Sequence, residues 1–428
     1  MNLRILHITP HLGGGIGSAV LNWTNKDINN EHTILCLDET YTKDSPEYQL
    51  ANNHIYENTH DNPFDIFNRI NYSDIVILHF WNHPRMFELL TNFQFPECRL
   101  ILWCHISGLY PPYTIPKAVV EFVDTFVFTS PISYEIPEIK NLPSYLKNKL
   151  NLVWTVGDIT KFRNIKKIQH ITFNIGYLGT LDFAKLHPNF IELCSKINIP
   201  NVRFIIIGRG NDSDKIIQQI KEKNLEWKFT VTGYVNNLNE WISYIDIFGY
   251  PLNPKHFGTC EQVLGEMVAA GIIPVVLNNP AENFIFSKSS NLITATTEEE
   301  YIAKIEELYN NIENYDIKIK LLQEEILDLY NPEHTTNTWT ILLNNSMLQP
   351  KQDRNWENNT NKIKYFGHEI FIKSLGNHAQ AFIEDSEEKI KEIFNSNPQW
   401  KSKTKGSVLQ YLKAFPNDMI LKKWSMYV

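Results

Sequence analysis

The stretch at residues 256–277 combines a turn, two carboxylates and the start of a helix. Gly258-Thr259 forms the turn, and Glu261 and Glu266 follow it along the chain. The first turn of an α-helix carries unpaired N–H groups and roughly half a positive charge, so it favours anions such as phosphate. The stretch therefore predicts a phosphate site at its helix start. Glu266 lies farther into the helix and could accept hydrogen bonds from sugar hydroxyls.

The same stretch predicts a helix that leads into a buried strand. Apolar and small side chains recur with helical spacing over 263–270, and Gly271 then ends the helix. Pro274 leads into the apolar run 275–277, which suits a buried parallel strand. An ordinary crossover helix packed on a sheet would show the same pattern, so the pattern alone does not establish a ligand site.

A second candidate anion site lies near the N-terminus. The apolar run 3–8 predicts a strand, the glycine-rich turn 13–17 follows it, and a helix runs on through Trp23. This order of elements brings backbone N–H groups against an anion. The glycine spacing matches neither the dinucleotide-binding pattern nor a P-loop, so the turn by itself is weak evidence.

Short apolar runs alternate with helical or turn segments in both halves of the chain. Further runs lie at 33–37, 75–80, 100–104, 125–129, 173–178, 202–208, 229–235 and 246–251. Such alternation predicts parallel sheets with helices on both faces. Ligands of such sheets bind beyond the carboxyl ends of the strands.

Several polar residues follow these predicted strands. His79, His83 and His105 lie at strand ends in the first half, where a histidine is more often structural than functional. Lys185 lies on a loop in the second half, where a lysine is usually a solvated surface charge. Asp212-Ser-Asp214 has the Asp-x-Asp spacing of some metal sites, but we expect it to cap a helix that starts near residue 215.

Length and composition limit the classes of protein to consider. A chain of 428 residues predicts two or three domains, and 43% hydrophobic with 21% charged residues is ordinary for a soluble protein. The net charge of −8 gives no reason to expect nucleic acid, and no apolar run is long enough for a membrane span. The N-terminus is too short and polar for a signal peptide. The five scattered cysteines indicate reduced thiols in a cytoplasm and no zinc site.

Taken together, these segments resemble the retaining GT-B glycosyltransferases, especially glycosyltransferase family 4 (glycosyl transferases group 1). The resemblance rests on Glu266 with the run 271–276, on the first glycine-rich loop and on Lys185, and it covers about residues 3–348. The chain departs from the family pattern at two places. Gly258 stands where the family has a glutamate, and Thr180 stands where it has an arginine.

The resemblance implies an α/β fold of two Rossmann-like domains that face each other across a cleft. Residues 1–156 would form the acceptor-side domain and residues 171–331 the nucleotide-sugar domain, joined by a polar linker at 157–170. Residues 332–348 would form a helix that returns to the first domain. Residues 351–428 would form a mostly helical extension of unassigned role.

The resemblance also implies roles for individual residues. His105, Lys185 and Glu266 would be catalytic, and His79 and Trp81 are candidates on the acceptor side. The residues expected to bind the donor are Gly14, Gly15, Gly17, Thr180, Lys185, Arg209, Tyr234, Val235, Gly258, Thr259, Cys260, Glu261, Gln262, Val263 and Glu266.

The implied activity is transfer of a sugar from a nucleotide sugar to a glycan, lipid-linked or protein acceptor. The transfer would be retaining and metal-independent, without a cofactor, with a UDP-sugar favoured over a GDP- or ADP-sugar. The task would be bacterial surface polysaccharide or glycoconjugate synthesis in the cytoplasm. Two alternatives stay open: a catalytically degenerate GT-B protein that binds a nucleotide or glycan, and a sugar-nucleotide epimerase of the same fold.

The extension at 351–428 carries more basic than acidic residues, and its end combines lysines with Trp424 and Tyr427. Such a surface could contact an anionic membrane or an acceptor, and the protein could then be membrane-associated. A small helical cap with a solvated basic face explains the same composition, and we favour that interpretation.

Overall fold

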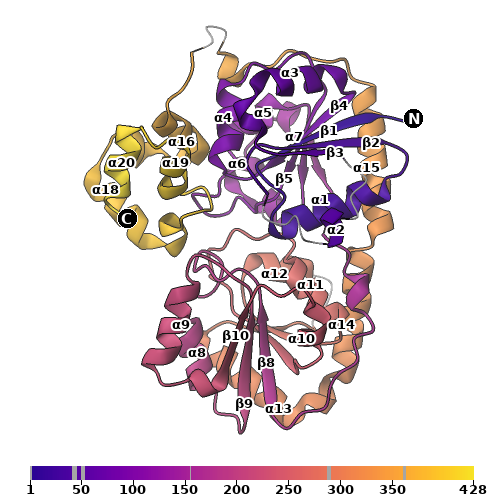
Figure 1. Cartoon of the computed structure of the whole chain (residues 1–428), viewed down its shortest axis with the longest axis vertical. Coiled ribbons are helices and arrows are strands. Elements are labelled where there is room, and N and C mark those ends of the chain that lie inside the picture. The colour runs from indigo at the N-terminus through magenta and orange to yellow at the C-terminus, as the bar shows by residue number, and fades with distance from the viewer. Residues whose placement is uncertain (1, 41–45, 50–53, 155, 287–290, 360–362) are drawn as a thin grey trace. The chain divides into compact units, whose positions relative to one another are not determined.

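The computed structural model describes residues 2–40, 46–49, 54–154, 156–286, 291–359 and 363–428 (Figure 1). Contacts along the chain define two compact units. The first consists of Met1–Gly157 with Pro332–Val428, and the second consists of Asp158–Asn331.

The first unit is built on a parallel sheet of seven strands among the described residues, in the order β3-β2-β1-β4-β5-β6-β7. The strands are β1 Arg4–Thr9, β2 Glu31–Cys36, β3 His54–Tyr56, β4 Ile75–Phe80, β5 Leu100–Cys104, β6 Thr125–Phe128 and β7 Leu150–Leu152. The helices around it are α1 Gly14–Lys26, α2 Pro46–Gln49, α3 Pro63–Tyr72, α4 Pro84–Asn92, α5 Lys117–Phe122, α6 Pro137–Lys140, α7 Ser144–Lys147 and α15 Pro332–Met347.

Three buried tryptophans join α1, the sheet and α15 in one core. Trp23 of α1 stacks on Trp339 of α15 with ring centroids 4.3 Å apart, and both rings contact Trp103 of β5. Because aromatic side chains bury large apolar areas, these contacts hold α15 firmly in the first unit. The helix α15 is thus part of the first unit (Figure 1).

The second unit is built on a parallel sheet of six strands among the described residues, in the order β10-β9-β8-β11-β12-β13. The strands are β8 Phe173–Leu178, β9 Val202–Ile207, β10 Phe229–Gly233, β11 Ile247–Tyr250, β12 Ile273–Leu277 and β13 Ile293–Ala295. The helices are α8 Phe190–Lys196, α9 Ser213–Glu222, α10 Leu238–Ile242, α11 Gln262–Ala269, α12 Pro280–Ile285, α13 Glu298–Asn311 and α14 Asp316–Leu329.

The α/β class and the parallel sheets predicted from the sequence are confirmed. The short strands β3 and β13 were not predicted. Thr155, next to the expected end of the first domain at residue 156, lies outside the described residues. The segment expected as a linker packs on the second unit from residue 158 onward. There Ile168 N–H donates to the carbonyl of Ser243 at 3.0 Å.

The C-terminal extension is helical, as expected, and it is part of the first unit. Its helices are α16 Gly367–Leu375, α17 Gln380–Ile383, α18 Glu387–Ser396, α19 Val408–Ala414 and α20 Met419–Ser425. The carbonyl of Ser374 accepts hydrogen bonds from Asn82 at 3.2 Å and from Thr114 at 2.6 Å. The buried guanidinium of Arg354 pairs with Asp124, so the extension is attached by polar as well as apolar contacts.

The five cysteines are buried free thiols. No helix within the described ranges has the length and hydrophobicity that a membrane span requires.

Candidate functional site

In the second unit, an ion pair between the half-buried Lys185 and the buried Glu261 links the loop after β8 to the start of α11. Lys185 Nζ lies 3.1 Å from Glu261 Oε2, and the Tyr250 hydroxyl donates to the same oxygen at 2.7 Å. Burial alone would raise the pKa of Glu261, but Lys185 and His256 lower it below its usual value. Glu261 is therefore ionised at neutral pH, and its charge is held by a cation and a hydroxyl.

Glu261 reaches this position through an unusual backbone conformation. It is the residue before α11 and lies in the left-handed region at φ 37° and ψ 59°. Few residues other than glycine adopt this conformation, and it costs of order 1–3 kcal/mol. Its carboxylate turns back against Gly258, so that a Cβ at position 258 would lie 1.7 Å from Glu261 Oε1. The Glu261 carboxylate thus occupies the space beside residue 258, where the family pattern has a glutamate.

His256 fixes the loop on the other side of this carboxylate. Its Nδ1 accepts from the N–H of Gly258 at 3.0 Å, so its Nε2 carries a proton and donates to Glu282 Oε2 at 3.1 Å. Burial lowers the pKa of His256, but the Glu282 carboxylate more than offsets this and the net shift is upward. The loop 256–261 is therefore held by a network of charges.

The helix α11 places two further predicted residues side by side. Gln262 Nε2 donates to Glu266 Oε1 at 2.7 Å, which orients the Glu266 carboxylate within the first two turns. Thr259 and Cys260 are buried, whereas Gln262 and Val263 are half-buried. The carbonyl of Cys260 accepts from the hydroxyl of Tyr330. The helix start is thus anchored by side chains that the sequence prediction did not include.

The remaining predicted donor residues of the second unit follow its other strands at the same edge of the sheet. Thr180 follows β8, and its carbonyl accepts from the Tyr177 hydroxyl at 3.1 Å. Arg209 follows β9, and its Nε lies 3.1 Å from the position of a Cβ on Gly233. Tyr234 is exposed and Val235 is half-buried after β10. The Arg209 side chain is therefore directed toward the end of β10.

The Asp212-Ser-Asp214 segment does not cap its helix as expected. Asp212 does stand directly before α9, but its side chain makes no capping bond. Its Oδ2 accepts from the N–H of Phe183 at 2.9 Å, and its Oδ1 pairs with Lys215 at 2.7 Å. The carboxylate thus links the loop after β8 to the start of α9. The Phe183 N–H takes the place of the helix N–H group that a capping carboxylate would accept from.

In the first unit, the glycine-rich turn exposes backbone at the start of α1. Gly14 has φ +59° with open space beside it, and Gly15 is also exposed. Gly17 is buried, and a Cβ there would lie 2.7 Å from the Leu12 carbonyl. The turn therefore needs glycine at Gly17 for close packing and at Gly14 for its conformation, and it presents backbone N–H groups at the carboxyl end of β1.

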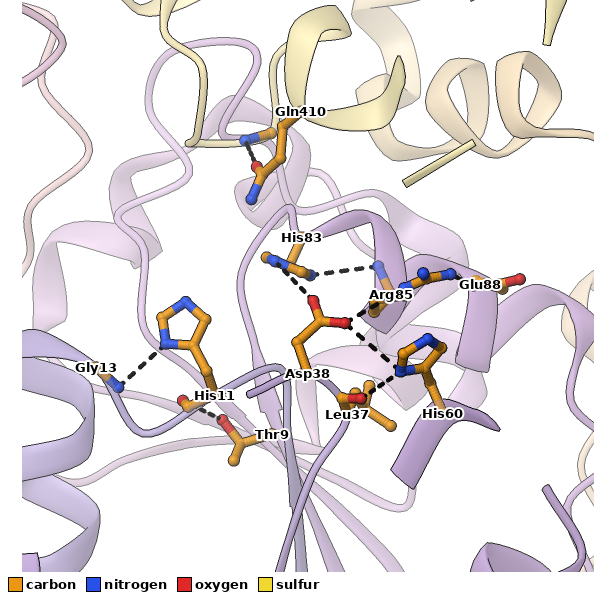
Figure 2. Close-up of polar contacts among 11 residues, drawn as sticks. Thr9, His11, Gly13, Leu37, Asp38, His60, His83, Arg85, Glu88 and Gln410 are labelled. Atoms are coloured by element: carbon orange, nitrogen blue, oxygen red, sulfur yellow. Dashed lines mark hydrogen bonds and ion pairs between the residues drawn. The ribbon is translucent and has the colours of Figure 1, made fainter. Parts of the chain in front are cut away.

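A polar cluster lies beside this turn, and His83 is the one member that the sequence prediction had named. Figure 2 shows His60, His83 and Arg85 around the half-buried carboxylate of Asp38. The closest of these contacts joins Arg85 Nε to Asp38 Oδ1 at 3.4 Å. His83 Nδ1 accepts from the N–H of Arg85 at 3.3 Å, and burial lowers its pKa well below the usual value. Asp38 follows β2, so its position after a predicted strand was the available signal.

The extension reaches the neighbourhood of this cluster. Burial, and secondarily the charge of Lys405, lower the pKa of His11 to about 4. A Cβ on Gly406 would lie 2.6 Å from the carbonyl oxygen of Asn82, so the loop before α19 packs against the end of β4. Gln410 of α19 accepts from the N–H of Gly406 at 2.6 Å (Figure 2).

His105 follows β5, and its Nε2 lies 3.0 Å from Nδ1 of His79. Burial lowers the pKa of His105 to about 3, so the imidazole is neutral. The structure thus brings the predicted residues together in two groups, one at the carboxyl edge of each sheet.

Comparison with known proteins agrees with this architecture. Residues 158–320 match the family described as Glycosyl transferases group 1. A curated relative, the 2-deoxystreptamine N-acetyl-D-glucosaminyltransferase of Niallia circulans, is 24% identical over 125 residues, which are 27% of this chain and 31% of the relative. The curated match therefore spans about a third of that protein's length.

Two solved structures extend the comparison to both units. HepE from Anabaena, in complex with UDP and glucose, aligns with a TM-score of 0.66 at 12% identity and covers 80% of this chain and 100% of its own. A glycosyltransferase from Rickettsia africae ESF-5 aligns with a TM-score of 0.59 at 13% identity and covers 81% and 99%. The chain thus has the GT-B fold, and the match to the glycosyl transferases group 1 model lies within its second unit.

Proposed function

We propose that the protein is a glycosyltransferase that moves a sugar from a nucleotide sugar to an acceptor hydroxyl. The observation that carries the proposal is the buried arrangement at α11. There a cation, Lys185, is held by an ionised carboxylate beside a helix start that carries Glu266. The family match over residues 158–320 supports the same activity.

The chemistry expected in the second unit is electrostatic. Departure of a nucleoside diphosphate develops negative charge, and Lys185 together with the N–H groups of the α11 start would stabilise that charge. Glu266 would accept hydrogen bonds from the ribose hydroxyls. Glu261 would take the place of the glutamate absent at position 258, because its carboxylate lies against that residue. Such a site would need no metal ion, and we propose that the transfer retains the anomeric configuration.

UDP is the nucleotide that we favour, since the HepE structures contain UDP, UDP with glucose and UDP-glucose. The first unit would bind the acceptor near Asp38, His83 and His105. The acceptor would be a glycan, a lipid-linked sugar or a protein, and the task would be surface polysaccharide or glycoconjugate synthesis in the cytoplasm. The lysines of the extension could add contact with an anionic membrane, although Lys423 is already paired with Asp385.

A donor screen tests the proposal. Thermal unfolding and hydrolysis would be measured with UDP-, GDP- and ADP-sugars for the wild type and for Glu266→Ala. A donor present at 100 times its dissociation constant adds roughly 2.7 kcal/mol to the stability of the native state. We expect one donor to stabilise the wild type and to be slowly hydrolysed, and Glu266→Ala to lose both effects. No response to any nucleotide sugar would refute the donor site.

A second candidate is a GT-B protein that binds a nucleotide without turning it over. It is favoured by Thr180, which supplies no charge where the family has an arginine, and by the pairing of Lys185 with Glu261. Stabilisation by a donor without hydrolysis, and without transfer to pooled glycan acceptors, would support this candidate.

A further inference from the structure

Four histidines of the first unit form a hydrogen-bonded chain across neighbouring strands. His32 of β2 lies against His7 of β1, with Nδ1 and Nε2 2.9 Å apart. His7 Nδ1 lies 2.9 Å from Nε2 of His79 on β4, and His79 Nδ1 lies 3.0 Å from Nε2 of His105 after β5. The chain follows the strand order β2-β1-β4-β5, so each link joins adjacent strands of the sheet.

The middle of this histidine chain is buried away from solvent. His7 and His79 are fully buried, and the ring of Trp23 packs edge-on against His7. Burial lowers the pKa of both histidines well below the usual value, so both imidazoles are neutral. A neutral imidazole has one N–H donor and one bare nitrogen that accepts, so each buried ring must donate in one direction and accept from the other.

One end of the chain is anchored on a carboxylate. His32 Nε2 lies 3.2 Å from Asp27 Oδ2, which also accepts from Asn30 Nδ2 at 2.8 Å. Burial would raise the pKa of Asp27, but the hydrogen bonds from His32 and Asn30 lower it below its usual value. An ionised carboxylate only accepts hydrogen bonds, so the proton between these two residues belongs to His32 Nε2.

The anchor fixes the direction of every bond in the chain. With its proton on Nε2, a neutral His32 accepts at Nδ1, so His7 donates from Nε2 and accepts at Nδ1. By the same step, His79 donates from Nε2 and accepts at Nδ1, and His105 donates from Nε2. The remaining nitrogen, Nδ1 of the half-buried His105, is left bare at the carboxyl edge of the sheet, with no hydrogen-bond partner among the described residues.

We propose that Asp27, His32, His7 and His79 are positioning residues that hold His105 with Nδ1 as an acceptor for a hydroxyl of the acceptor sugar bound by the first unit. The choice of a sugar rests on the proposed function, whereas the tautomer itself does not. A bare nitrogen attracts a hydroxyl and repels a phosphate or carboxylate oxygen, since both would offer lone pairs. The chain therefore selects a hydrogen-bond donor at this point of the site.

The tautomers can be read directly from the ligand-free full-length protein labelled with ¹⁵N-histidine. Spectra that correlate ring protons with ring nitrogens distinguish protonated from bare nitrogens. The spectra are recorded at pH 8, where an imidazole with the ordinary histidine pKa of about 6.5 carries a single proton. We expect His105 to show a protonated Nε2 and a bare Nδ1. A protonated Nδ1 on His105 in the wild type would overturn the proposal.

His32→Phe tests the coupling along the chain. Without His32, His7 Nε2–H would be a buried donor without a partner, which costs more than a bare buried nitrogen. The bonds should reverse and put a proton on His105 Nδ1, more than 70 residues away in sequence. The matched control is His54→Gln, because His54 is an exposed histidine of β3 outside the chain. His54→Gln should leave the His105 signals unchanged, and an unchanged His105 in folded His32→Phe would refute the coupling.

The ligand is tested separately by titration with pooled glycan acceptors. We expect the Nδ1 signal of His105 to move toward that of a hydrogen-bonded nitrogen, while the signals of His54 stay in place. If the glycans raise the melting temperature but leave Nδ1 of His105 unmoved, acceptor binding stands and the hydroxyl contact at His105 is refuted.

Discussion

Gly258→Ala tests the position of the Glu261 carboxylate most directly. The backbone at Gly258 is not in the left-handed region, so alanine is compatible with its conformation. The new Cβ would lie 1.7 Å from Glu261 Oε1, however, and the carboxylate would have to move. Moving it separates Glu261 from Lys185 at 3.1 Å and from the Tyr250 hydroxyl at 2.7 Å.

The expected cost follows from these two contacts. Hydrogen bonds to charged groups contribute about 1.5–3 kcal/mol each. Lys185 is partly exposed and can regain water, so we expect a net loss of about 3 kcal/mol rather than the sum. For a unit of this size, each kcal/mol lowers the melting temperature by about 2–4 °C. Gly258→Ala should therefore lower the melting temperature of the second unit by roughly 6–12 °C.

The assay is thermal unfolding in a double-mutant cycle with Glu261→Ala. When Glu261 is already alanine, the closest neighbour of the new Cβ is absent, and only His256 Nδ1 at 2.9 Å remains close. The added Gly258→Ala change should then cost much less than it does in the wild type. An equal loss in both backgrounds, or a loss below about 2 °C in the wild type, would refute the assigned position of Glu261.

Three further changes probe the rest of the molecule. Lys185→Met should lower the rate of donor hydrolysis at least tenfold, because no lysine cation would then stabilise the negative charge on the leaving diphosphate. An unchanged hydrolysis rate in a stopped assay would exclude Lys185 from the chemistry. The raised pKa of His256 contributes stability that is fully present below the unfolded pKa near 6.5 and is lost as pH rises through the folded pKa. Melting temperature should therefore decline from pH 6 to pH 9 by more in the wild type than in His256→Gln. Arg354→Ala removes the cation from the half-buried Asp124 carboxylate, which keeps the N–H of Leu100, and should cost about 1.5–3 kcal/mol, with faster proteolysis of the extension than in Arg354→Lys; equal rates would show that this ion pair does not hold the extension.

Much of the local structure could be predicted from the sequence. The strands β4 and β5 begin and end at the predicted residues, because each is an apolar run with polar residues at its ends. The helix α11 ends before Gly271, whose φ of +75° is the conformation that favours glycine after a helix. The resemblance at Lys185 and Glu266 also indicated correctly that both residues lie toward the carboxyl edge of the second sheet.

The position of the Glu261 carboxylate could not be predicted in this way. Its carboxylate reaches the space beside Gly258 only because Glu261 adopts a left-handed backbone conformation, which few residues other than glycine adopt. Spacing along the chain therefore placed Glu261 out of register with the family pattern, whereas the folded loop restores a carboxylate near that position.

By itself, the sequence determined the order of the elements, the α/β class and the set of polar residues at strand ends, because these depend on neighbours within a few residues. Only the tertiary structure decided which distant residues touch. His7, His32 and His79 lie on different strands. The parallel register pairs His32 with Ile5 and His7 with Ile77, so each histidine lies two residues from the next along the register and on the same face of the sheet. Register is set by packing of the whole sheet, which no short stretch of sequence contains.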